Sequence, residues 1–495
     1  MIVTLILLCW LLMTAPAGAA DTPEPSPLRS ALDSLSSARM MADVTRLSAA
    51  DYNGRQTGTA DDLLSASLIA ERLHSLGLHP RGTDSLTTEE TRVVPPGRWA
   101  QSDPVTVSQL TGRMRLEVSG GGRTASTQPG TDFLPILDSP SVDVTAPILF
   151  VGYGLSDPSR GVDDYVGLDA RGKIVLFLRG KPEGYDGPSG LTDKVRAARE
   201  KGAVAFLTVT GPVLSPYEAR RGMTVAPMAA YGADPLPGAW ITPDLADVAL
   251  AAGGRTLRQL QERLNQRAGP QSLTTGAVAR LAWERSQSRG PMVNVVCALP
   301  GQDSRKASEA VLIGAHRDHF GRHGGLLFPG ADDNASGTAV LLETARVLAA
   351  SRIKPKRTVL FVSFSGEEQG LLGSRLYVNR PVLPLDRLAA MINVDHAGVG
   401  NGRLTVGVTG LARERAADAG RLAGLSDLLD LFGFFPGGDH VPFKEAGVPT
   451  VTVVSGGPHP HFHQPADRAE TVQPQILEKA ARYVLALTWL LADAE

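Results

Sequence analysis

The sequence predicts an α/β protein with an open, mostly parallel sheet covered by helices on both faces. From residue 291 onward, apolar β-rich runs alternate with helical segments, as in sheets whose strands are joined by crossover helices. Glycine (53) and proline (35) are abundant, which fits many turns and a substantial β content. The 495 residues also exceed what one hydrophobic core usually serves, so at least two domains are expected.

Short apolar runs are the predicted strands of the C-terminal region, and two long amphipathic segments are its predicted helices. The strands are 294–301, 310–316, 358–366, 390–398 and 448–456. The helices are 336–351 and 476–492, which carry apolar residues at helical spacing.

Upstream of residue 291 the pattern differs. Residues 61–76 predict a helix that ends before Gly77, and residues 81–145 carry short strand signals without a long helix. Residues 146–154 and 172–180 are glycine-bounded strands, 191–211 a helix followed by a strand, and 255–267 an amphipathic closing segment. We therefore expect a separate β-rich module over 146–285, without its own cluster of acids and histidines.

The first twenty residues predict a cleaved signal peptide. Residues 2–13 are almost wholly apolar, and small residues at 17–19 suit a signal peptidase. Twelve apolar positions are too few to span a bilayer, which needs about 20 residues. We expect a secreted or periplasmic protein with no stable membrane anchor. Cys9 would leave with this segment, so Cys297 would have no disulfide partner within the chain.

Composition excludes one class of partner. Charged residues make up 20% of the chain, and its net charge is −2. Because nucleic-acid binding relies on a basic excess, we expect no nucleic-acid partner.

Acids and histidines gather at the ends of the predicted strands. In open α/β sheets, ligands bind beyond the carboxyl ends of the strands. Eight of the ten histidines follow residue 315, and the candidate residues end or follow successive strands. They are His316, Asp318, Asp333, Glu367, Glu368, Asp395 and His463.

Two adjacent acid pairs, Asp332-Asp333 and Glu367-Glu368, indicate the chemistry of this site. Carboxylates and imidazoles are ligands of divalent zinc. In such a pair, one acid can bind metal while its neighbour moves a proton, which suggests hydrolysis assisted by two metal ions. Each pair alone is more often a turn or a helix cap. Their joint occurrence along one sheet edge favours the metal site.

Six motifs carry a resemblance to a known family. They are GAHRDHFG (314–321), PGADDNASGTAVLLETAR (329–346), FSGEEQGLLGS (364–374), NVD (393–395), GGDHVPF (437–443) and HFHQPADRAET (461–471). Through them, residues 291–470 resemble the secreted aminopeptidases with two co-catalytic zinc ions (bacterial leucyl-aminopeptidase-like zinc peptidases). Residues 146–180 resemble the start of a protease-associated domain inserted into such a peptidase.

The resemblance implies a discontinuous peptidase domain. Its N-terminal part would be residues 27–95, followed by a β-rich connecting segment over 96–145 and the inserted domain over 146–285. The catalytic zinc peptidase domain would then occupy residues 286–495, and residues 1–20 would be the signal peptide.

The resemblance also implies a ligand set for two Zn²⁺ per chain. Asp333 would bridge both ions, His316 and Asp395 would complete one site, and Glu368 and His463 the other. Each ion would keep one position for a shared water.

Further roles follow from the same motifs. Glu367 would be the general base, and Asp318 would hydrogen-bond the far nitrogen of His316. Asp439 and His440 either line the substrate pocket or serve packing. His396 stands where the family more often has a hydrophobic residue, and it either forms a wall or reshapes the pocket.

Other polar residues near the motifs are not expected to be metal ligands. Asp332 is expected to hydrogen-bond its own loop, because Asp333 matches the bridging position. His459 and His461 crowd His463, and the HQPAD pattern favours His463 as the ligand. His319 and His323 are expected to be solvated loop residues.

The implied function is that of a zinc-dependent aminopeptidase acting on peptides or proteins with a free N-terminus. A carboxypeptidase or dipeptidase on the same scaffold stays open, because the metal core does not decide which terminus enters. A glutaminyl cyclase is disfavoured, because that chemistry is associated with one zinc. A non-catalytic peptide-binding or receptor-like protein should have lost ligands, and none is missing. The sequence leaves the oligomeric state open.

Overall fold

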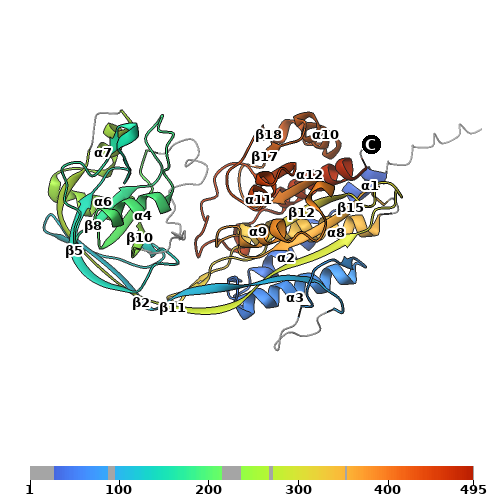
Figure 1. The fold of residues 1–495 in the computed structure, drawn as a ribbon, viewed down its shortest axis with the longest axis horizontal. Coiled ribbons are helices and arrows are strands. Elements are labelled where there is room, and N and C mark those ends of the chain that lie inside the picture. Colours follow the sequence, from blue (N-terminus) through green and yellow to red (C-terminus); the bar gives the residue numbers. More distant parts are fainter. Residues whose placement is uncertain (1–26, 87–94, 214–235, 267–270, 352–353, 494–495) are drawn as a thin grey trace, which may run out of the picture.

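The computed structural model describes residues 27–86, 95–213, 236–266, 271–351 and 354–493. Two halves are joined by two long strands, β2 (Ala100–Gly120) and β11 (Leu273–Leu299), which pair antiparallel along most of their length (Figure 1). We call residues 27–86 and 291–493 the larger half, and residues 104–290 the smaller half. One continuous sheet runs through both.

The larger half is built on the strand order β18-β17-β19-β16-β12-β15-β11. Strands β15, β12, β16 and β19 are mutually parallel, whereas β11 and β17 border them antiparallel. Their bounds are β12 Ala310–His316, β15 Thr358–Phe364, β16 Leu388–Val394, β17 Leu404–Thr409, β18 Leu429–Phe432 and β19 Thr450–Ser455. The fold-class prediction is confirmed, and so are the five predicted strands of this region.

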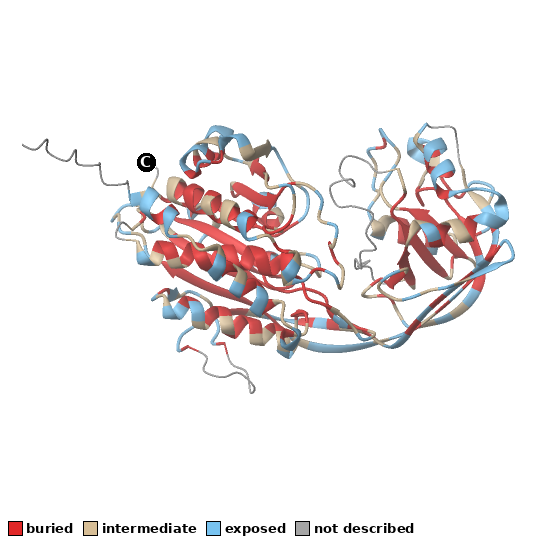
Figure 2. Ribbon diagram, turned by 180° about the vertical axis from the view of Figure 1, so that it is seen from behind, coloured by how far each residue is buried: buried red, intermediate tan, exposed pale blue. Residues whose placement is uncertain are grey.

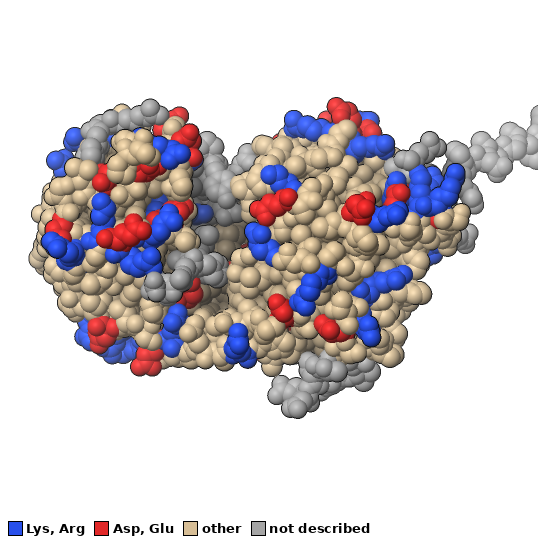
Figure 3. Space-filling model, viewed as in Figure 1, with Lys and Arg blue, Asp and Glu red and all other residues tan. Residues whose placement is uncertain are grey.

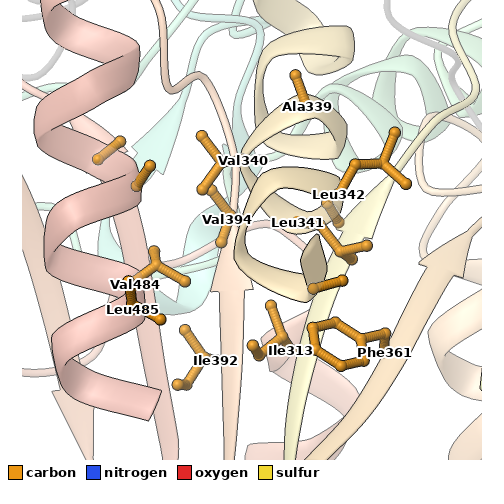
Figure 4. Close-up of a cluster of buried hydrophobic side chains, with 14 of the residues drawn as sticks. Ile313, Ala339, Val340, Leu341, Leu342, Phe361, Ile392, Val394, Val484 and Leu485 are labelled. Carbon is orange, nitrogen blue, oxygen red and sulfur yellow. The ribbon is translucent and has the colours of Figure 1, made fainter. Parts of the chain in front are cut away.

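Helices cover both faces of this sheet because its strands are apolar on both sides. Along β12, Val311 and Ile313 belong to one buried cluster, whereas Ala310 and Leu312 belong to another. Figure 4 shows Ile313 with its neighbours on the first face, beneath α8 and α12. The helices contributing to this cluster are α1 Pro27–Asp33, α2 Ser37–Leu47, α3 Ala60–Ser75, α8 Gly337–Ala350, α10 Arg413–Ala423 and α12 Pro474–Asp493. On the second face lie α9 Leu372–Asn379 and α11 His440–Glu445.

The smaller half continues the sheet in the order β11-β5-β8-β9-β10-β4. Strands β5, β8, β9 and β10 are parallel, and β4 closes the edge antiparallel. Their bounds are β4 Phe133–Pro135, β5 Val142–Phe150, β8 Ile174–Leu178, β9 Ala205–Val209 and β10 Gly238–Ile241, with helices α4 Leu191–Glu200, α6 Pro243–Leu250 and α7 Leu257–Asn265. These elements bury apolar clusters of their own, so the central strands of both halves are buried, whereas β2 and β11 keep exposed positions where they join the halves (Figure 2).

Short elements complete the described chain. They are α1 Pro27–Asp33, β1 His79–Pro80, β3 Arg123–Ser126, β6 Ser156–Asp157, β7 Val162–Asp163, β13 Gly321–His323, β14 Leu326–Phe328, and the irregular turn η4 Ala331–Ser336 that leads into α8. The 3-10 turns are Ala50–Tyr52, Pro158–Arg160, Ala251–Gly253, Leu385–Arg387, Ser426–Leu428 and Ala469–Thr471.

The surface and the helices bear on possible partners. On the face in Figure 3, Lys and Arg alternate with Asp and Glu over both halves, without a patch of one sign. Among the described residues, no helix combines the length and the apolar composition needed to cross a bilayer. The predicted signal peptide, residues 1–20, lies outside the described part of the chain.

Candidate metal centre

The candidate residues converge because four parallel strands end at one edge of the larger half. His316 ends β12, Glu367 follows β15 and Asp395 follows β16. The register places His316 beside Phe364 of β15, so the loops after both strands begin at the same level. The turn η4 carries Asp333, and the segment after β19 carries His463.

His316 stands at the centre of a first group. Its Nε2 lies 3.3 Å from Asp395 Oδ1 and 3.4 Å from Asp333 Oδ1. Glu367 Oε2 is slightly farther away, at 4.0 Å. His316, Asp333 and Asp395 bring one donor atom each to within 4.8 Å of one another, close enough to share one metal ion.

A second group uses the other oxygen of Asp333. His463 Nε2 lies 3.0 Å from Asp333 Oδ2 and 3.4 Å from Glu368 Oε2. The two oxygens of one buried carboxylate thus face two different imidazoles. This is the geometry that a bridging carboxylate requires.

The fold holds Asp333 through its backbone. Asp467 accepts hydrogen bonds from the backbone N–H groups of Asp332 (2.9 Å) and Asp333 (3.0 Å). The neighbouring Asn334 donates its side-chain amide to the Val394 carbonyl at 2.9 Å. Sequence reasoning missed Asp467 as a site residue, although it belongs to the HQPAD pattern.

Asp318 organises the loop that carries the two glutamates. Its carboxylate accepts from the Thr57 hydroxyl at 2.9 Å and from the backbone N–H groups of Glu367 (3.3 Å) and Glu368 (3.4 Å). His316 Nδ1 lies 3.3 Å from the Asp318 carbonyl oxygen and 3.6 Å from its Oδ1. The expected partner of the far nitrogen is therefore present, with the backbone carbonyl as its nearer acceptor.

The prediction that His319 and His323 are solvated is wrong. His319 is 1% exposed, and its Nδ1 lies 2.6 Å from Glu368 Oε1. His323 is equally buried, accepts the Leu110 N–H at Nδ1 and donates from Nε2 to the Phe320 carbonyl. The loop folds inward because its backbone pairs with the 54–56 turn, a contact that strand patterns cannot show. Burial lowers the pKa of both imidazoles, that of His323 to about 4.

The Asp332 carboxylate accepts a hydrogen bond from a nearby backbone group, and it also lies close to two histidines. Its Oδ1 accepts the Gly398 N–H at 2.8 Å, and its Oδ2 lies 2.6 Å from His459 Nδ1. His396 Nδ1 is 3.6 Å from the same oxygen, while its Nε2 lies 3.7 Å from Asp333 Oδ2. His461 lines the cavity of about 210 Å³ beside these groups.

Asp439 and His440 are buried behind the centre. His440 donates from Nε2 to the Phe435 carbonyl at 2.7 Å, and its Nδ1 lies 2.7 Å from the Thr452 hydroxyl. Both ring nitrogens therefore have partners inside the fold, which favours packing over a role in the pocket. Burial raises the pKa of Asp439 to about 7.

The electrostatics of the centre fit cation binding. Burial raises the pKa of Glu367 and of Glu368 well above their usual values, and neighbouring carboxylates add to this rise. Burial disfavours charge on His316 too, yet Glu367 and Asp395 hold its pKa well above the ordinary value. Buried carboxylates that face one another need protons or metal ions. Imidazole and carboxylate donors at these separations suit zinc.

A second cavity, of about 600 Å³, opens beside the centre and reaches the smaller half. It is lined by Gln56, Thr106, Ser108, Leu137, Asp138, His319, Phe320, Glu368 and Gln369. Two of these lining residues are acids, and none of them is Lys or Arg. A cavity of this polarity beside the centre suits a cationic group better than an anionic one.

Comparison with protein families places this centre inside a known sequence pattern. The model of Peptidase family M28 matches residues 294–488. Aminopeptidase YwaD of Bacillus subtilis (strain 168) is 32% identical over 195 residues, which cover 37% of this chain and 41% of that protein. A probable leucine aminopeptidase of Arthroderma otae is 26% identical over 228 residues, covering 43% and 61%. The chain thus spans less than two thirds of the length of these relatives.

Solved structures share the fold over nearly the whole chain. An aminopeptidase from Aneurinibacillus sp. strain AM-1 has a TM-score of 0.65 at 23% identity, covering 94% of this chain and 97% of that one. BSAP, a zinc aminopeptidase from Bacillus subtilis, has a TM-score of 0.59 at 24% identity, covering 93% and 96%. The arrangement of both halves therefore recurs in other proteins.

Proposed function

We propose that this chain, whose residues 294–488 match the model of Peptidase family M28, is a zinc-dependent aminopeptidase that removes N-terminal residues from peptides. One observation carries the proposal. The two oxygens of Asp333 face His316 at 3.4 Å and His463 at 3.0 Å, as a carboxylate shared by two metal ions must. The aminopeptidase names of the similar proteins agree with it.

In this proposal, five side chains hold two zinc ions. His316 and Asp395 would serve one ion, Glu368 and His463 the other, and Asp333 both. Such a pair of ions, when bound, polarises the scissile carbonyl and lowers the pKa of water.

Glu367 is the proposed general base. Its carboxylate reaches to 4.0 Å from His316 Nε2, and its side chain keeps 16% of its surface accessible. It would take a proton from the attacking water and return it to the leaving amine. Asp318 holds the backbone that carries this side chain by accepting the N–H of Glu367.

His319 is proposed to position Glu368. Because its Nδ1 lies 2.6 Å from Oε1, the other oxygen, Oε2, is directed toward His463. Hydrogen bonds of this kind fix the orientation of a metal-binding carboxylate. The ring of His319 is itself packed against Phe320.

A carboxypeptidase is the second candidate, because a probable glutamate carboxypeptidase of Arabidopsis thaliana is 34% identical over 163 residues. That chemistry requires a cation to receive the C-terminal carboxylate of the substrate. The cavity beside the centre is lined by Asp138 and by no Lys or Arg, which favours a substrate ammonium group.

The test compares amino-acid p-nitroanilides with N-acylated dipeptides, each with and without a chelator. An aminopeptidase should cleave only the free-amine substrates, lose activity on chelation and regain it with zinc. Cleavage of the acylated dipeptides alone would favour the carboxypeptidase. Tight peptide binding without cleavage in the presence of zinc would favour a receptor-like protein.

Two further proposals concern the rest of the chain. Residues 146–285 would form the inserted, protease-associated-like domain, which agrees with the separate apolar clusters of the smaller half. Residues 1–20 would direct export as a cleaved signal peptide. N-terminal sequencing of the protein recovered from periplasm or medium tests the second proposal, and deletion of 146–285 followed by assays on short and long peptides tests the role of the first.

A further inference from the structure

Three residues beside the proposed metal pair form a group that the hydrolytic mechanism does not use. Asp332 lies on η4, His396 follows β16, and His459 belongs to the segment after β19. One donor atom from each lies within 4.8 Å of the other two. Their side chains are 6%, 14% and 12% exposed, so the group is almost withdrawn from solvent.

Hydrogen-bond partners leave two acceptor atoms facing each other in this group. His459 Nε2 lies 3.1 Å from the Ser455 carbonyl oxygen, which can only accept, so Nε2 carries the proton. In the neutral ring, Nδ1 then presents its lone pair to Asp332 Oδ2 at 2.6 Å. The other oxygen of Asp332 is already taken by the Gly398 N–H. A cation, either a proton or a metal ion, is needed at this contact.

His396 is directed into the group by its backbone. Its φ of 45° is in the left-handed region, which a non-glycine residue adopts only when the surroundings hold it there. The Ser455 N–H donates to its carbonyl at 2.9 Å and fixes this turn. Its Nδ1 consequently lies 3.6 Å from Asp332 Oδ2.

The whole centre is strongly acidic, and protons as well as cations can balance its charge, because burial raises the pKa of Asp439 and Asp467. Eight carboxylates with little or no exposure gather at this sheet edge: Asp318, Asp332, Asp333, Glu367, Glu368, Asp395, Asp439 and Asp467. Two zinc ions and the buried Arg55, which lies near Asp467, Asp318 and Asp333, would offset five of these charges. Arg317 is paired with Asp62 instead.

We propose that Asp332, His396 and His459 form a third cation site, which takes a borderline divalent ion such as zinc. Two imidazoles and one carboxylate are a donor set that zinc and similar transition metals accept. The small pocket next to them has room for about one water, which would complete the coordination. The hydrogen bonds from Gly398 and to Ser455 are the outer partners that orient such ligands.

A cation bound at this third site would hold two segments of the centre together. An ion at this site would link η4, which carries Asp333, to the segment that carries His463. The site needs neither Glu367 nor Glu368, so it does not depend on the proposed hydrolysis.

The experiment counts bound metal. The full chain is stripped with a chelator, dialysed against buffered free Zn²⁺ and measured by plasma mass spectrometry. Three zinc ions per chain are expected in the wild type and in Glu367→Gln, but two in His459→Ala. His79→Ala, which removes an exposed imidazole far from the centre, is the matched control and should keep three. Circular dichroism verifies folding, and His459→Asn is measured alongside as a second variant that keeps a polar side chain at this position.

Each outcome is decisive. Equal zinc counts in the wild type and in both His459 variants overturn the third site, because a proton then occupies the Asp332–His459 contact. Two ions in the wild type with no loss in those variants leave the proposed metal pair intact. One ion in the wild type and none in the variants supports the third site. That result would contradict the pair of zinc ions on which the proposed function rests.

Discussion

The two halves handle their acidic residues in opposite ways. In the smaller half, acids near its 540 Å³ cavity have cations of their own, with Arg160 2.9 Å from Asp157 and Arg196 2.9 Å from Asp193. In the larger half, acids meet histidines and one another at the sheet edge. Both halves have parallel strands and covering helices. Hence the fold alone does not make the site. Ions from solution are expected where several buried acids share histidines rather than having an Arg or Lys each.

The largest effect is expected from making the same Glu→Gln substitution once in each half and comparing kcat. Glu367→Gln removes the proposed base but keeps its shape, so kcat should fall about 10²- to 10⁴-fold. Glu200→Gln makes the same change beside the cavity of the smaller half and should leave kcat unchanged. Steady-state kinetics on an amino-acid p-nitroanilide measures both. Zinc content should be equal in the two variants, and full activity in Glu367→Gln would refute its role.

A second test concerns how Glu368 is held. His319→Ala removes the partner of Oε1, and losses of such partners typically lower metal affinity about 10- to 100-fold. Competition with a zinc-binding dye measures that affinity, with His79→Ala as the control. His319→Gln can still donate to Glu368 and should recover part of the loss. If zinc affinity is the same in all three variants, His319 serves packing alone.

The third test exploits the pH dependence of the metal-free protein. Burial raises the pKa of Asp467 to about 8 and that of Asp439 to about 7, and it also raises those of Glu367 and Glu368. Between pH 6.5 and 8 the folded chain therefore holds protons that the unfolded chain has lost, so its stability falls as pH rises.

His316, with a raised pKa, acts in the same direction over this window. The buried His319 and His323, with lowered pKa values, oppose it below this window and in its lower part, where the unfolded imidazole titrates. A loss of about 1–2 kcal/mol is expected across the window. Thermal unfolding at several pH values should show it, and saturating zinc should flatten the slope. A flat profile without metal would contradict the assignment.

Much of the larger half was predictable because its information is local. The apolar runs that became β12, β15 and β16 are short and bounded by turn residues, and ligands in parallel sheets lie at strand ends. The ligand set came from motifs and stays a prediction, although the structure does bring Asp333 close to both His316 and His463. By contrast, β2 is 21 residues long, and its pairing with β11 joins segments more than 150 positions apart. No local pattern encodes such a pairing.

His319 and His396 show the same limit of sequence-based prediction, because their contacts are with residues distant in the sequence. His319 follows a strand in a glycine-bounded loop, which suggested solvent exposure. Its burial depends on Arg55, whose guanidinium donates to the Pro329 and Gly330 carbonyls and whose carbonyl accepts the His319 N–H. That contact crosses more than 260 positions of sequence. The departure at position 396 was visible in the sequence, but its contact with Asp332 was not.

The smallest effect on stability and activity is expected from breaking an exposed ion pair of the smaller half. Arg196→Gln breaks the ion pair with Asp193 on the exposed face of α4, and exposed pairs typically contribute about 0.2–1 kcal/mol. Chemical denaturation should thus shift little, and kcat and zinc content should not change. Added salt should weaken the wild-type pair and narrow even that difference. A large loss of activity in this variant would show that the smaller half takes part in the chemistry, and the contrast between the two halves would then fail.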